Sequence, residues 1–178
     1  MGELTREFPQ FSIRLKSGDW LSSVLDRFLK LVTWGGQSGY LTKYHTVLGY
    51  TLYVSTSWDK MNADEKYVLL RHERVHLRQR RRLTFPLMAF IYIFPLFPLG
   101  LAYGRARLEW EAYKETLAAT VEVFGVSAVE DDALRSQIVE RFVSADYGWM
   151  WPFPQTVEGW YNREIARLGA TVYKSHIK

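Results

Sequence analysis

Residues 84–104 form a run of 21 residues without a charged side chain. A run of this length can cross the hydrocarbon core of a bilayer as one helix. Pro86, Pro95 and Pro98 interrupt it, and a proline inside a helix removes a backbone hydrogen bond and clashes with the preceding turn. The run therefore leaves two possible arrangements of the chain. Its two flanking segments either meet on one side of an apolar layer or lie on opposite sides of it.

The rest of the chain has a globular composition. It has 178 residues, of which 48% are hydrophobic and 24% charged, as expected for one domain with its own core. We expect a single domain over residues 1–178, with a core over 40–124 and a helical and aromatic C-terminal extension over 125–178.

The expected fold class is α+β and mostly helical. Hydrophobic periodicity predicts helices over 19–33, 62–83, 105–124, 129–143 and about 156–168. Residues 40–47 and 50–55 are rich in Tyr, Thr and Val and flank Gly49, which predicts a β-hairpin. Asn62 and Glu65 have the spacing of a capping box at the start of the 62–83 helix.

That helix contains the pattern His72-Glu73-Arg74-Val75-His76, or HExxH. An α-helix turns once every 3.6 residues, so His72 and His76 lie on one face and can share a metal ion. Glu73 is offset by about 100° and can reach a water molecule at that ion. With His72 at 0°, His76 falls near 40°, beside apolar positions, whereas most of the arginines fall between about 180° and 280°. We therefore expect the histidines to point inward.

The later helix offers a third ligand. Glu111, Glu115 and Glu122 lie on one charged stripe of the 105–124 helix, and Glu109 stands alone on the opposite, apolar face. A lone carboxylate among apolar residues needs a partner. A metal ion is one such partner, and a buried salt bridge to Arg105 is the alternative.

The pair of motifs resembles the gluzincin metallopeptidases, in which HExxH is followed by ExxA on a second helix, here Glu109 to Ala112. The resemblance covers about residues 48–120. It implies a small zincin-like domain, a zinc cofactor and hydrolysis of peptide bonds, with His72, His76 and Glu109 as ligands and Glu73 as general base. Many members have Asp after that Ala; this chain has Tyr113, whose phenol can donate or accept a hydrogen bond beside a ligand histidine.

A shared metal site excludes a simple membrane span. A span would separate His76 from Glu109 by about 30 Å, whereas both must lie about 2 Å from one ion. We expect residues 84–104 to form a broken hairpin, either buried in the domain or docked on a membrane surface. Residues 1–10 carry Glu3, Arg6 and Glu7 and have no apolar core, so we expect no signal peptide and a cytoplasmic location, with or without peripheral membrane contact.

Composition excludes other functions. The chain has no cysteine, which excludes disulfide frameworks and thiolate metal sites. A net charge of +4 without a recognition motif gives no reason to expect nucleic acid. The six arginines between positions 71 and 82 predict a solvated helix face, with an anionic partner as the alternative. The aromatic run 147–153 most simply packs on a core, although a lid or a membrane-interface patch would also use such residues.

The sequence thus predicts a zinc-dependent metallopeptidase. Tyr113, Tyr147 and His45 are candidates for stabilising the oxyanion. Residues 50–55 alternate as a strand, and we expect Tyr50, Leu52 and Val54 to lie on a strand edge that binds an extended polypeptide through its backbone; the alternative is that both edges are covered within the chain. A non-enzymatic, membrane-peripheral protein using residues 84–104 and the arginines is the competing interpretation. The oligomeric state is left open.

Overall fold

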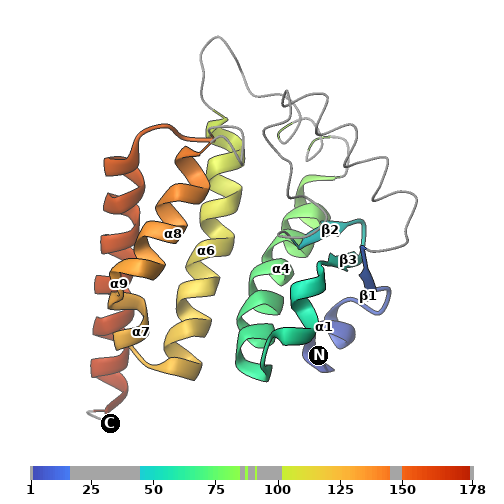
Figure 1. Ribbon diagram of the computed structural model, residues 1–178, viewed down its shortest axis with the longest axis horizontal. Helices are drawn as coiled ribbons and strands as arrows, with labels where there is room; N and C mark the ends of the chain where they lie inside the picture. Colours follow the sequence, from blue (N-terminus) through green and yellow to red (C-terminus); the bar gives the residue numbers. More distant parts are fainter. Residues whose placement is uncertain are drawn as a thin grey trace. The chain divides into compact units, whose positions relative to one another are not determined.

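The computed structural model describes residues 2–16, 45–84, 87, 91, 102–144 and 150–176. The chain divides into two compact units, Met1–Arg82 and Leu83–Lys178. The fold is α+β and mostly helical, as the sequence predicts (Figure 1). The division at residue 82 falls inside the region 40–124 that the sequence treats as one core, so each unit is described by itself.

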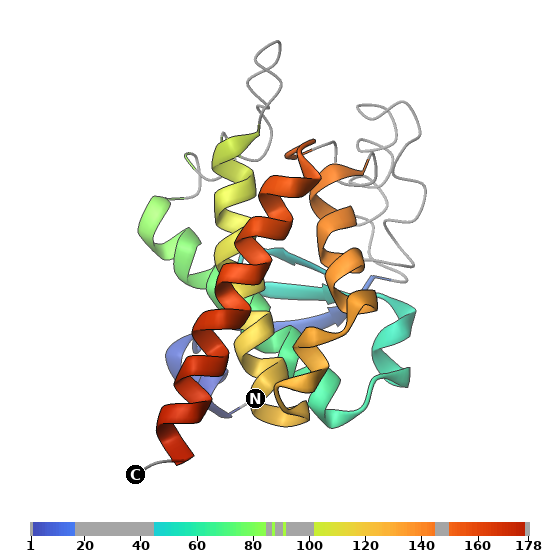
Figure 2. The ribbon, with the colours of Figure 1, turned by 90° about the vertical axis from the view of Figure 1, so that its left-hand side faces the viewer.

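The first unit combines a small sheet with one long helix. Its elements are α1 (Gly2–Glu7), β1 (Ser12–Leu15), β2 (Thr46–Leu48), β3 (Thr51–Val54), the 3-10 helix η1 (Thr56–Lys60) and α4 (Ala63–Leu83). The strand order is β1-β3-β2, with β1 parallel and β2 antiparallel to β3 (Figure 2). The predicted hairpin is confirmed as β2 and β3, which a two-residue turn joins. Gly49 begins that turn with φ 69°, a conformation that glycine adopts without steric cost.

β3 is the central strand, which corrects the prediction about substrate. Its neighbour on one edge is β2, and on the other edge Ser12 N–H donates to Tyr50 C=O at 3.0 Å and Lys16 N–H donates to Val54 C=O at 2.9 Å. The expectation that Tyr50, Leu52 and Val54 present a free strand edge to substrate is therefore wrong. The physical reason is that β1, an N-terminal strand not predicted from the sequence, already pairs with that edge.

The core of the first unit holds α4 against the sheet and α1. Its buried members are Leu4, Phe8, Phe11, Leu52, Val54 and Leu77. The capping box at the start of α4 is confirmed, because Asn62 N–H donates to Glu65 Oε2 at 2.8 Å and Glu65 N–H donates to Asn62 Oδ1 at 2.9 Å. Such reciprocal bonds satisfy helix N–H groups that have no partner within the helix.

The arginine face of α4 is covered in part by α1, rather than being only solvated. Arg78 donates two hydrogen bonds to the Glu7 carboxylate, at 2.7 and 2.8 Å, and Arg74 Nε donates a third at 2.6 Å. The Arg81 guanidinium lies 5.5 Å from the centre of the Phe8 ring. These arginines therefore stabilise the fold by fixing the N-terminal helix on α4.

The second unit is built from three long helices that lie side by side (Figures 1 and 2). Its elements are α6 (Tyr103–Phe124), the short α7 (Ser127–Glu130), α8 (Asp132–Val143) and α9 (Pro154–His176). The predicted helices 105–124 and 156–168 are present, the second one longer than expected, whereas the predicted helix 129–143 is divided at Asp131 into α7 and α8. Gly125, with φ 86°, ends α6.

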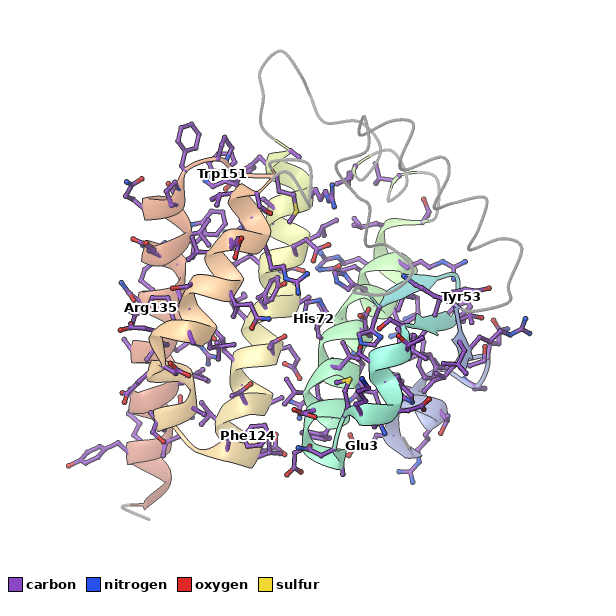
Figure 3. All side chains as sticks on the ribbon, viewed as in Figure 1. Glu3, Tyr53, His72, Phe124, Arg135 and Trp151 are labelled. Atoms are coloured by element: carbon purple, nitrogen blue, oxygen red, sulfur yellow. The ribbon has the colours of Figure 1, made fainter. Side chains whose placement is uncertain are left out.

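An aromatic cluster fills the middle of the second unit. Trp110, Phe142 and Trp160 contact one another with ring centres 5.7 to 6.2 Å apart. Trp151 packs on this cluster where α8 ends and α9 begins (Figure 3). Of the described residues in the run 147–153, Trp151 thus packs on the core as expected, whereas Phe153 is 47% exposed.

Some sequence predictions lie outside the described residues. These are the helix 19–33, Tyr147 and most of the run 84–104. Over the parts of the chain that the structure describes, no helix combines the length and the apolar character needed to cross a membrane.

Glu7 should make the first unit sensitive to acid. Hydrogen bonds from Arg78 are the largest cause of a pKa lowered from 4.5 to about 2 for Glu7; burial opposes this change and Arg74 adds to it. Because the folded-state pKa is lowered, the contribution of Glu7 to stability is complete above pH 4.5 and is lost as the pH falls towards 2.

We expect Glu7→Gln to reduce the free energy of unfolding by about 1–3 kcal/mol at neutral pH, the usual value of hydrogen bonds to charged groups. Urea unfolding at a series of pH values should show this difference shrinking below pH 4.5. Glu3→Gln is the matched control, because Glu3 is 80% exposed and contacts Arg74 only at 3.3 Å. Equal effects of the two substitutions would contradict the assignment.

Candidate metal centre

His72 and His76 are paired on one face of α4. Their Nε2 atoms lie 3.2 Å apart, and their ring centres lie 4.9 Å apart with an interplanar angle of 71°. Two nitrogens that bind one tetrahedral zinc ion at 2.0–2.1 Å are separated by about 3.3–3.4 Å. The two rings are joined by a hydrogen bond between their Nε2 atoms, and these two atoms already have the spacing of a pair of ligands.

Gln79 continues the same helix face one turn beyond His76. Its Oε1 lies 3.0 Å from His76 Nδ1, and its side chain is buried, with 2% exposure. The sequence places Gln79 on the histidine face, but no role is predicted for it. The sequence does hold a sign of this contact. Gln79 comes three residues after the candidate ligand His76, and side chains at that spacing on a helix are neighbours.

Glu73, the expected general base, is buried with 6% exposure. Glu73 directly follows His72 in sequence and comes one helical turn before Leu77. Leu77 is part of the core of the first unit. The backbone of Glu73 is thus anchored by a residue on the neighbouring turn.

Glu109 lies on α6 and is partly buried, next to Leu108 and Trp110, which are buried. Within the described residues, His72, His76 and Glu109 are a group of potential metal ligands. Two imidazole nitrogens and one carboxylate oxygen are the donor set of many catalytic zinc sites, with the fourth position open to water. The residues present therefore fit such an ion.

The acidic stripe on α6 has a different environment. Glu111 and Glu115 line a shallow pocket of the second unit together with Glu164 and Arg167 of α9. Arg167 donates to Glu164 at 2.9 Å through Nε. Part of the charged stripe thus lies against α9, and Glu111 and Glu115 are partly buried, as Glu109 is.

The other candidate residues have local roles that the structure defines in part. The Tyr113 ring packs against Phe142, with centres 5.6 Å apart, in the second unit. His45 Nδ1 accepts a hydrogen bond from Ser55 N–H at 3.3 Å, and burial, aided by the charge of Lys16, lowers the pKa of His45. A neutral His45 that accepts at Nδ1 carries its proton on Nε2, so it can donate a hydrogen bond there.

Comparison with known proteins gives no relative: no family description, curated protein or solved structure matches this chain. The resemblance to gluzincins therefore depends on the two motifs and on the geometry of the residues within them.

The metal ligands can be distinguished by two matched substitutions on α6. We expect Glu109→Ala to lose tight zinc binding and Glu111→Ala to retain it, because Glu109 lies on the opposite face of α6 from Glu111 and is the carboxylate of the predicted ligand set. Zinc content after gel filtration, measured by atomic emission, gives the result directly. A protein that loses zinc with Glu111→Ala and keeps it with Glu109→Ala would show that the wrong face of α6 has been chosen.

Proposed function

We propose that this protein is a zinc-dependent metallopeptidase, with His72, His76 and Glu109 as ligands and Glu73 as general base. The observation that supports this most directly is the 3.2 Å separation of the two Nε2 atoms within an HExxH helix. This contact is a hydrogen bond between the two rings, and it keeps both Nε2 atoms at the spacing that two ligands of one ion need. The donor set of two histidines and one glutamate adds support.

A zinc ion bound there would polarise the scissile carbonyl and lower the pKa of a bound water. Glu73 is the residue of the chain that takes up a proton from the attacking water, and it then returns this proton to the amine that leaves. Its burial keeps bulk water from competing for that proton transfer. A neutral His45 and Tyr113 are the described candidates for donating a hydrogen bond to the oxyanion.

The proposed substrate is a polypeptide, since peptide-bond hydrolysis is what the motif pair implies. Because both edges of β3 are paired within the chain, this proposal does not use that strand for binding. The absence of cysteine suits a reducing compartment, so we include a cytoplasmic setting in the proposal.

The competing function, a non-enzymatic membrane-peripheral protein, has less support. It depends on residues 84–104, most of which lie outside the described part of the chain, and on the arginine face of α4. Arg74 and Arg78 of that face are engaged by Glu7. Anionic lipid would have to compete with an intramolecular carboxylate for these two guanidinium groups.

Replacing the general base should separate catalysis from metal binding. We expect Glu73→Gln to retain one zinc per chain and to lose about 10²–10⁴-fold in kcat, because an amide cannot accept the proton. The assay is cleavage of a mixture of unstructured synthetic peptides, with new amino termini identified by mass spectrometry. Glu158→Gln, an exposed carboxylate on α9, is the control and should keep full activity.

Two results would contradict the proposal. Hydrolysis by Glu73→Gln at the wild-type rate would show that another group is the base. Cleavage by wild-type protein that persists after zinc has been removed with a chelator would show that the metal centre is not the catalyst.

A further inference from the structure

We propose that Gln79 is a positioning residue for the metal centre: its side-chain carbonyl accepts the Nδ1–H of His76 and so fixes the tautomer and the ring plane of that ligand. This inference rests on the proposed metal site and adds to it a residue that the HExxH pattern does not contain. The carrying observation is the 3.0 Å contact between His76 Nδ1 and Gln79 Oε1.

The chemistry of the contact permits one productive arrangement. If the amide presents its oxygen, His76 carries its proton on Nδ1, and Nε2 keeps the lone pair that a metal needs. If the amide presented its NH₂ group instead, Nδ1 would be the acceptor and a neutral ring would carry its proton on Nε2, where it blocks the metal. In the first arrangement His76 Nε2 accepts the 3.2 Å hydrogen bond from His72 Nε2–H, so the atom that would bind a metal carries no proton of its own.

Burial makes this partner hard to replace. Gln79 is 2% exposed, so bulk water has little access to the position that its carbonyl holds. His76 and Gln79 are three residues apart on the same helix, a spacing that keeps their side chains in contact without help from a loop. The helix therefore presents the ring of His76 already oriented, and metal binding does not have to include the free energy of ordering it.

The partner is an amide, whereas many ligand histidines have a carboxylate partner. A carboxylate would add negative charge next to a site that already has Glu109 as a proposed ligand, and it would make the imidazole a stronger electron donor. A neutral carbonyl orients the ring equally well and leaves the ion more electrophilic. Gln79→Glu should thus preserve or tighten zinc binding, yet slow peptide hydrolysis.

The experiment compares zinc affinity among four full-length proteins, measured by competition with a chromophoric chelator. Gln79→Leu keeps the size of the side chain and removes the acceptor, and we expect its zinc Kd to rise by about 10–100-fold, as for other partners of ligand histidines. Gln79→Glu should restore the Kd to the wild-type value or below. Gln137→Leu, at an exposed position on α8, is the matched control and should bind as the wild type does.

A second measurement does not depend on any variant. Long-range ¹H–¹⁵N correlation spectra of the zinc-free wild-type protein at neutral pH report which ring nitrogen of His76 is protonated. We expect the Nδ1–H form to predominate. Predominance of the Nε2–H form would overturn the inference, and so would a Gln79→Leu protein that folds and binds zinc with the wild-type Kd.

These results also separate the inference from the proposed function. If wild-type and Gln79→Leu proteins bind zinc equally well and Glu73→Gln is inactive, the metallopeptidase stands and only the role of Gln79 fails. If the wild-type protein binds no zinc, both proposals fail. If Gln79→Leu does not fold, the tautomer of His76 and the zinc Kd of Gln79→Glu decide the matter, since a Kd raised by that substitution contradicts an acceptor role.

Discussion

The rotation of α4 about its own axis is the constraint on which the first unit depends, because three faces of this helix carry three different sets of side chains. With His72 at 0°, His76 and Gln79 fall within about 40° of it. Leu70 and Leu77, near 140–160°, pack into the core of the unit. Arg74 and Arg78, near 200–240°, meet α1. A small rotation of α4 would break two of these sets of contacts in order to improve the third.

Contacts distant in sequence hold that rotation in place. Glu7 reaches Arg74 and Arg78 across 67 and 71 residues of chain, and Leu77 packs with Leu52 and Val54 from the central strand. The capping box fixes where the helix begins, but a cap acts along the axis and does not choose which face turns to the sheet. The position of the histidines is therefore set by the core and by the salt bridges on the far side of the helix.

This explains which features could be predicted from the sequence. The helices with strong periodicity, the cap at Asn62, the hairpin around Gly49 and the common face of His72 and His76 all follow from local patterns, and the structure contains them. α1 and β1 were missed because a helix of six residues and a strand of four are too short for either period to be recognised. Parallel pairing of β1 with β3 also joins segments 39 residues apart, such as Ser12 and Thr51, and no local pattern reports it.

The missed strand is also the reason that the substrate prediction failed. Alternation over residues 50–55 correctly indicated a strand, but alternation cannot distinguish an edge strand from a central one. Leu52 and Val54, at 0% and 1% exposure, together with the buried Tyr53, show the burial on both faces that a central strand under a helix acquires. Likewise, the angular positions of the arginines on α4 predict a polar helix face. They cannot show that Glu7, from another segment of the same chain, supplies the carboxylate that binds Arg74 and Arg78.

Buried polar side chains on either side of the histidines give the strongest reason to regard this face of α4 as functional. Glu73 and Gln79 are 6% and 2% exposed, and removing a carboxylate or an amide from water costs free energy that hydrogen bonds only partly recover. Leucine at either position would serve a helix whose sole task was to pack, as Leu77 does between them. The chain instead has Gln79, whose side-chain oxygen lies at His76 Nδ1, and Glu73, which directly follows His72 in sequence. The proposed metal centre, which needs an oriented imidazole and a nearby base, would account for both of these buried polar groups.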